Sequence, residues 1–144
     1  MDTNTWGLSF HHLGLAVPEP ESAIRFLKGL NYQIGDLVYD PRQDINLILC
    51  RSSEMPVIEI VFPAKVPSVI DKILEKNRDG GIYHTCFESQ NVQESLSSIK
   101  RDGIRFITIL PPTPAILFEH RPVSFYLVQG YGIIEILEAK PIRP

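Results

Sequence analysis

One type of segment occurs twice in this chain of 144 residues, an aliphatic run around a single glutamate. The runs are PVIEIVF at residues 56–62 and GIIEILE at residues 132–138. In both runs, aliphatic residues occupy the positions that would point to either face of a strand, which is typical of a strand buried on both faces. Transferring an ionised carboxylate from water into such a strand is costly unless the carboxylate is paired or binds a metal ion. Glu59 and Glu135 therefore each need a partner.

A histidine-containing segment precedes each glutamate at nearly the same separation. His12 lies in the segment at residues 10–17, and His84 lies in the segment at residues 82–88. The pattern predicts two copies of one module, each opening on a histidine strand and closing on a glutamate strand. Two imidazoles and two carboxylates are then four potential metal ligands.

The segments between these strands predict one helix and two further strands in each module. The helices are expected to begin after residue 18, where proline and acidic residues favour a first turn, and at Asn91, with Glu94 three positions later. Gly29 is expected to end the first helix. Further strands are expected at residues 32–39, 45–50, 104–109 and 123–128, and a stiff loop at the prolines of residues 111–114 and 119–122.

Each module is therefore βαβββ, and we expect one α+β domain over residues 1–144. The first module covers residues 9–63, the second covers residues 81–139, and a short helical connector joins them. Alternate side chains of a strand point to opposite faces. His12, Glu59, His84 and Glu135 are all placed on the faces away from the helices, where they can share one cavity.

Composition limits the classes of partner. A net charge of −3 argues against a nucleic-acid partner, which requires a basic face. No apolar run reaches the ~20 residues of a membrane-spanning helix. The first residues lack the features of a signal peptide, so a cytoplasmic location is expected. Cys50 and Cys86 lack metal-type spacing and are expected to be free buried thiols.

These motifs resemble the vicinal oxygen chelate superfamily of glyoxalase I, methylmalonyl-CoA epimerase, extradiol dioxygenases and bleomycin-resistance proteins. The resemblance covers roughly residues 9–139 and is closest to the epimerases. It is carried by HLGLAV at residues 12–17, by ILEK at residues 73–76 leading to GIYH at residues 81–84, and by IIEI at residues 133–136. The implied fold is an eight-stranded, incompletely closed barrel around a metal site, and homodimers are common in the family.

The resemblance implies that His12, Glu59, His84 and Glu135 bind one divalent metal ion. Two nitrogen and two carboxylate ligands suit Zn, Ni, Co, Mn or Fe and do not select among them. The implied reaction moves a proton next to a carbonyl of a small-molecule substrate, such as an acyl thioester, through a metal-stabilised enolate. Glu135 is the first candidate for the catalytic base, and Glu59 is the second.

Three other functions stay open at this point. A glyoxalase I-like lyase is favoured by Glu59, because epimerases often have glutamine there. A non-catalytic, resistance-type binding protein would normally lose the ligands. A dioxygenase could use His12, His84 and Glu135 for iron, but a fourth ligand would occupy a position that oxygen or substrate needs.

The loops hold fewer clear signals. Epimerases place an acidic residue, which acts as a second proton-transfer group, where Arg42 stands in this chain. Asp44 is the alternative residue for this role. His120 and Arg121 are expected in a solvated loop, with anion binding as the alternative. Tyr126 and Tyr131 are expected to be packing residues, and His11 is expected to point away from the ligands.

Overall fold

A computed structural model describes residues 4–141 and divides the chain into two compact units. The first unit is His12–Tyr83, and the second unit consists of the chain up to His11 together with the chain from His84 onward. The boundaries fall inside two strands, β1 and β5.

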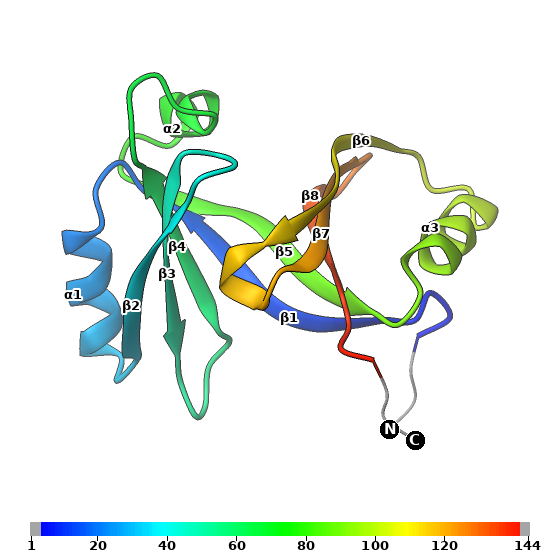
Figure 1. Cartoon of the computed structure of the whole chain (residues 1–144), viewed down its shortest axis with the longest axis horizontal. Coiled ribbons are helices and arrows are strands. Elements are labelled where there is room, and N and C mark those ends of the chain that lie inside the picture. The colour runs from blue at the N-terminus through cyan, green and yellow to red at the C-terminus, as the bar shows by residue number, and fades with distance from the viewer. Residues whose placement is uncertain (1–3, 142–144) are drawn as a thin grey trace. The chain divides into compact units, whose positions relative to one another are not determined.

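Each unit contains the elements of one predicted module (Figure 1). The first series is β1 (Leu8–Ala16), α1 (Glu21–Gly29), β2 (Gln33–Asp40), β3 (Ile45–Arg51), β4 (Ile58–Pro63) and the connector helix α2 (Asp71–Lys76). The second series is β5 (Gly81–Ser89), α3 (Val92–Arg101), β6 (Phe106–Ala115), the 3-10 turn η1 (Ile116–Phe118), β7 (Arg121–Val128) and β8 (Gly132–Glu138).

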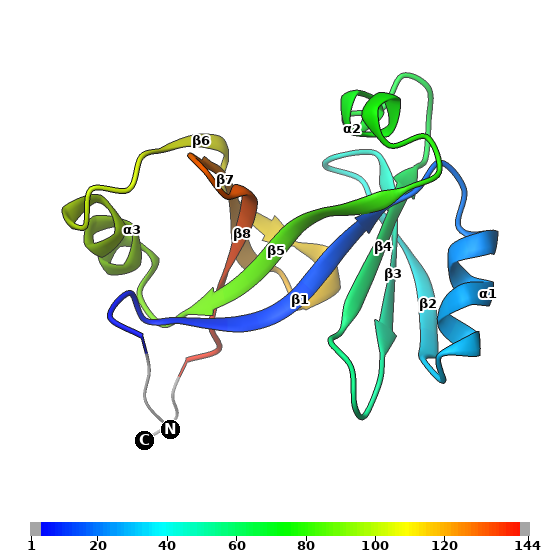
Figure 2. The same cartoon turned by 180° about the vertical axis from the view of Figure 1, so that it is seen from behind.

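The strand order is the same in both units. Counted from the histidine strand, it is β1-β4-β3-β2 in the first unit and β5-β8-β7-β6 in the second. The histidine strand runs parallel to the glutamate strand in each case, β1 with β4 and β5 with β8 (Figure 2). The pairs β2–β3, β3–β4, β6–β7 and β7–β8 are antiparallel. The α+β class, the two βαβββ modules and the eight strands are therefore confirmed for the part of the chain that the structure describes. The single-domain organisation with boundaries at 9–63 and 81–139 stays a prediction.

The proline-rich segment differs from its prediction. Residues 111–114 continue β6, and Pro122 belongs to β7, where it lies opposite Pro114. Proline lacks the N–H that a central strand needs, but an edge strand tolerates it. β6 is the last strand of its sheet, and its register shifts between Thr108 and Thr113. An irregular edge strand therefore takes the place of the expected loop.

The helix ends follow the sequence signals in one case and not in the other. Asn91 caps α3 by accepting a hydrogen bond from the backbone N–H of Glu94 (3.1 Å), as predicted. In α1 the expected stop, Gly29, is still helical, and Asn31 takes the left-handed conformation with φ 69°. Asparagine tolerates this conformation better than most residues, which explains how it replaces glycine. Among the described residues, no helix has the length and apolar character needed to cross a membrane.

The two cores confirm the predicted strand faces. In the first unit, Ile58 and Ile60 of β4 pack with Leu27 of α1. In the second unit, Ile134 and Ile136 of β8 pack in one cluster with Val92 and Leu96 of α3. Because alternate residues face opposite ways, Glu59 and Glu135 lie on the faces away from the helices.

Cys50 lies in the first core and is fully buried, as its strand position predicts. Its thiol donates to the carbonyl of Ile48 at 3.9 Å. Burial disfavours the thiolate and raises the pKa of Cys50 to about 11. The neighbouring Tyr32 donates its hydroxyl to the carbonyl of Pro56 at 2.6 Å, and burial raises its pKa too.

We therefore expect this unit to lose stability at alkaline pH. The unfolded chain releases the Cys50 proton near pH 9, whereas the folded chain holds it to about pH 11, so stability falls as the pH rises through this window. The contribution of Cys50 is about 2–3 kcal/mol over two pH units. Urea unfolding of wild type and Cys50→Ala between pH 8 and 11 measures the difference. Parallel pH dependences in the two proteins would contradict the assignment.

Candidate functional site

The first histidine–glutamate pair joins β1 to β4. His12 and Glu59 are buried, with 0% and 5% of their surfaces exposed, and His12 Nε2 lies 3.9 Å from Glu59 Oε1. Gly14 stands directly opposite Glu59 in the parallel ladder. His12 is two residues before Gly14, so His12 and Glu59 lie on the same face of the sheet.

The second pair has the same construction in β5 and β8. His84 and Glu135 are 2% and 4% exposed, and His84 Nε2 lies 3.1 Å from Glu135 Oε1. Cys86 stands opposite Glu135, so His84 is again two residues before the partner of the glutamate. The predicted equivalence of the two modules is thus confirmed at the level of register and contact.

Each pair supplies one imidazole nitrogen and one carboxylate oxygen from a buried position. A buried carboxylate is stabilised either by a charged partner or by a metal ion. Imidazole and carboxylate together suit the borderline divalent metals of the first transition row and Zn. The donor set of each unit therefore fits half of a metal site with two nitrogen and two oxygen ligands.

One neighbour of the second pair, Phe125, was not singled out from the sequence. The ring of Phe125 meets the His84 imidazole edge to face, with 5.3 Å between ring centroids, and Phe125 stands opposite Glu135 in β7. Cys86 takes the position that Gly14 has in the first module. The alternation of Ser124, Phe125 and Tyr126 is the signal that could have placed Phe125 on the ligand face.

Asp44, the alternative second base, is held in the β2–β3 turn. It has a left-handed backbone with φ 52°, accepts a hydrogen bond from the Tyr39 hydroxyl, and lies 3.0 Å from the Lys65 ammonium. The Tyr39 and Lys65 interactions lower the pKa of Asp44, which makes its carboxylate a weaker base. Arg42, in the same turn, donates its backbone N–H to Asp40 at 2.8 Å.

The prediction that Arg121 lies in a solvated loop is wrong. Its side chain is only 15% exposed, and its guanidinium lies 3.0 Å from the Glu88 carboxylate and donates to the carbonyls of Phe118 and Glu138. These contacts occupy the side chain that would otherwise bind an anion. His120 is exposed, as expected, with a left-handed backbone at φ 61°.

The packing prediction is confirmed for Tyr126 and is wrong for Tyr131. Tyr126 is buried against Phe106, with 5.5 Å between ring centroids. Tyr131 is exposed, and its hydroxyl lies 2.9 Å from that of Thr85. His11 packs edge to face against Phe118 at 5.2 Å. None of these residues belongs to either histidine–glutamate pair.

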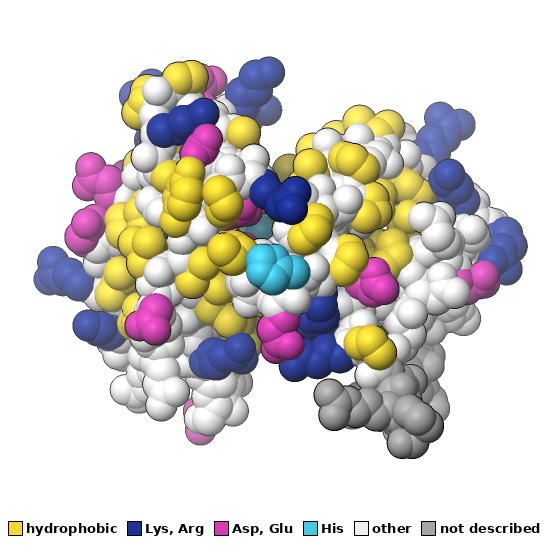
Figure 3. Space-filling model, viewed as in Figure 1, with side chains coloured by type: hydrophobic (Ala, Val, Ile, Leu, Met, Phe, Trp, Pro, Cys, Tyr) yellow, Lys and Arg dark blue, Asp and Glu magenta, His cyan; other side chains and the backbone are white. Residues whose placement is uncertain are grey.

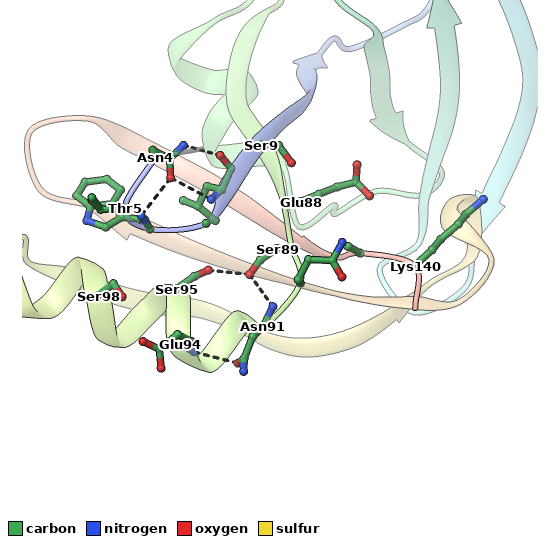
Figure 4. Close-up of a pocket in the computed structure, with 15 residues that line it drawn as sticks. Asn4, Thr5, Ser9, Glu88, Ser89, Asn91, Glu94, Ser95, Ser98 and Lys140 are labelled. Carbon is green, nitrogen blue, oxygen red and sulfur yellow. Dashed lines mark hydrogen bonds between the residues drawn. The ribbon is translucent and has the colours of Figure 1, made fainter. Parts of the chain in front are cut away.

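A pocket of about 640 Å³ lies elsewhere in the second unit (Figure 4). It is lined by residues 4–9 and 88–91 and by the first turns of α3, and by none of the four predicted ligands. The hydroxyls of Ser89 and Ser95 lie 2.7 Å apart at its wall, and Ser89 accepts from the backbone N–H of Asn91. These polar groups stabilise the start of α3 and are not part of the candidate site.

The chain is similar to proteins of known function. The human mitochondrial methylmalonyl-CoA epimerase is 28% identical over 107 residues, which cover 73% of this chain and 60% of the human protein. The matched part of the chain thus spans about three fifths of that relative. An ethylmalonyl-CoA/methylmalonyl-CoA epimerase of Cereibacter sphaeroides is 29% identical over 98 residues, covering 67% of this chain and 72% of the relative.

The structural and family comparisons extend over most of the chain. The crystal structure of methylmalonyl-CoA epimerase from Mycobacterium tuberculosis superposes with a TM-score of 0.76 at 20% identity, covering 97% of this chain and 94% of that one, which shows a shared fold. The family model of the Glyoxalase/Bleomycin resistance protein/Dioxygenase superfamily matches residues 11–125. This chain therefore belongs to the Glyoxalase/Bleomycin resistance protein/Dioxygenase superfamily.

Proposed function

We propose that the chain is a divalent-metal-dependent epimerase that moves a proton next to the carbonyl of an acyl thioester. The observation that carries the proposal is the pair of register-equivalent, buried histidine–glutamate pairs on the sheet faces away from the helices. The relatives that are epimerases of methylmalonyl-CoA and ethylmalonyl-CoA support the reaction and the thioester class.

The metal ligands in this proposal are His12, Glu59, His84 and Glu135. Two neutral imidazoles and two carboxylates suit Zn, Ni, Co, Mn or Fe and would neutralise the charge of a divalent ion. When bound, such an ion polarises the carbonyl of the substrate and so makes the adjacent C–H more acidic. The protein supplies the donors, and each of the four side chains is buried.

Glu135 is the proposed base. Its carboxylate is buried and lies 3.1 Å from His84, whose ring packs against Phe125, the strand partner of Glu135. Glu59 is the second candidate because it is the register equivalent in the other module. Asp44 is the weaker candidate, because Tyr39 and Lys65 already engage its carboxylate.

A glyoxalase I-like lyase is the second candidate function. The observation that favours it is the carboxylate of Glu59, which the resemblance associates with glyoxalase I. Both reactions remove a proton next to a carbonyl and differ in where the proton returns. The substrate, a malonyl-type thioester or a glutathione thiohemiacetal, distinguishes them.

The metal content tests the ligand assignment. We expect about one divalent metal ion per chain in the native protein and at least a tenfold lower content in His84→Ala. His120→Ala is the matched control, because His120 is exposed and belongs to neither pair. Elemental analysis of the three proteins after gel filtration gives the comparison. Equal metal content in His84→Ala and wild type would remove His84 from the ligand set.

Hydrogen exchange tests the reaction and the base. In deuterated water the metal-loaded protein should exchange the α-hydrogen of methylmalonyl-CoA, as followed by mass spectrometry. Glu135→Gln should lower the exchange rate at least about 100-fold, the usual contribution of a general base. Asp44→Asn should retain most of the wild-type rate.

Two results would overturn this assignment. Undiminished exchange in Glu135→Gln would exclude Glu135 as the base. Turnover of a glutathione thiohemiacetal without exchange of the thioester would establish the lyase instead of the epimerase.

We further propose that the protein is a cytoplasmic homodimer. Exposed apolar side chains such as Phe26 and Leu37 support a subunit contact, because apolar surface that is contiguous often marks a site of protein association. Light scattering at micromolar concentration should give twice the 16.3 kDa mass of the chain. A mass of one chain would contradict the dimer.

A further inference from the structure

A further pocket of the second unit is almost entirely apolar. It measures about 270 Å³, and its lining residues, none of them charged, include Phe87 and Ile134 of the sheet, Ile99 of α3, Ile104 in the segment after α3, and Trp6. Because Phe87 and Ile134 alternate with the residues that face the histidine–glutamate pair, the pocket lies on the opposite face of the sheet. α3 turns its apolar side towards this face, whereas Figure 3 shows polar and charged side chains on its outer side. The pocket is therefore separate from the candidate metal site.

The repeat identifies the counterparts of the lining residues in the first unit. The backbone N–H of Ile104 donates to the carbonyl of Ile99 at 3.3 Å. The backbone N–H of Tyr32 donates in the same way to the carbonyl of Leu27 at 3.0 Å. Both hydrogen bonds close the end of the helix of their module, so Tyr32 is the counterpart of Ile104. Leu27 is likewise the counterpart of Ile99.

In the first unit the counterpart positions form a closed core. Tyr32 is only 6% exposed and belongs to one cluster with Leu27. The counterparts of the two sheet residues, Leu15 and Ile58, pack against that cluster. They are identified by their distances in sequence from the histidine and the glutamate of their module. The phenol ring of Tyr32 therefore fills the space that is a pocket in the second unit.

The side chains of the second unit leave this space open. Ile104 supplies no ring, and a volume of about 270 Å³ remains although Phe87 is larger than its counterpart Leu15. Trp6 does not fill it, because its indole N–H donates to the Asp102 carboxylate at 2.7 Å and the ring forms part of the wall. Protein interiors leave few voids larger than a water molecule, and apolar voids do not hold water well. An apolar space of this size therefore points to a ligand.

We propose that this pocket binds a small, uncharged aromatic compound, whose ring occupies the place that the Tyr32 ring takes in the first unit. Apolar cavities of about 150 Å³ bind benzene, so the larger volume here accommodates a substituted ring. A charged ligand is disfavoured, because it would lose its hydration without gaining a charged partner in the lining. Tyr131, which also lines the pocket and is 61% exposed, marks the side from which the compound enters. The inference does not depend on the proposed epimerase function.

The probe for this site is p-cresol, which is the tyrosine side chain as a free compound. Isothermal titration calorimetry should give saturable binding to a single class of site, and p-cresol should raise the midpoint of thermal unfolding with increasing concentration. Trp6 is the only tryptophan of the sequence, so a change in its fluorescence reports binding at the pocket. p-Toluate, in which a carboxylate replaces the hydroxyl, should bind at least about tenfold more weakly, because the lining offers it no charged partner.

Ile104→Tyr introduces into the second module the ring that the first module already has. It should weaken p-cresol binding at least about tenfold and raise the unfolding midpoint of the free protein, because the ring fills the pocket. Val128→Phe fills the pocket from another lining residue, in β7, and should weaken binding as well if Ile104→Tyr does not fold. Ile107→Tyr is the matched control, because Ile107 belongs to the same unit, is 64% exposed and does not line the pocket. It should bind p-cresol as the wild type does.

Four results would overturn the ligand site. The first is the absence of saturable p-cresol binding to the wild type. The second is undiminished binding to the folded pocket-filling variants, which would place the ligand elsewhere on the protein. The third is an equal loss of binding in Ile107→Tyr, which would indicate a general effect of the added tyrosine. The fourth is equal affinity for p-toluate, which would contradict an uncharged ligand.

Discussion

The cost of placing a carboxylate inside an aliphatic strand governs the rest of this structure. Glu59 and Glu135 are each buried between apolar neighbours, and each lies beside a histidine on the adjacent parallel strand. A parallel neighbour requires a crossover connection, which is why a helix and two further strands separate the two segments in each module. The helix then covers the aliphatic face of the sheet, so the opposite face is left for the polar pairs. In both units, the position of the histidine–glutamate pair thus depends on the order in which helix and strands follow one another.

Much of this arrangement could be predicted because strands alternate with a period of two. The positions of His12 and His84 relative to their glutamates follow from parity and from the repeat, and the cores around Ile60 and Ile136 have the predicted composition. The cap at Asn91 was equally predictable, because the hydrogen bond involved spans only three residues. Local signals and strict alternation were sufficient for these features.

The features that were missed depend on contacts between segments far apart in the sequence. The prolines of β6 indicated a loop because nothing local shows that a strand lies at the edge of its sheet. Arg121 was expected in solvent, but Glu88, 33 positions earlier in the chain, binds its guanidinium. The approach of Phe125 to His84 likewise depends on strand order. Sequence alone gave no measure of which partner each of these side chains would meet.

The prolines of β6 have a consequence for how copies of this protein meet in a crowded solution. An exposed edge strand offers a row of free backbone groups to which another chain can add a strand, and this is a common route to aggregation. Pro111, Pro112 and Pro114 present no N–H along this edge, and the shifted register bends it away from a straight template. The sheet of the second unit is therefore protected against uncontrolled growth at the margin closest to its exposed aliphatic side chains.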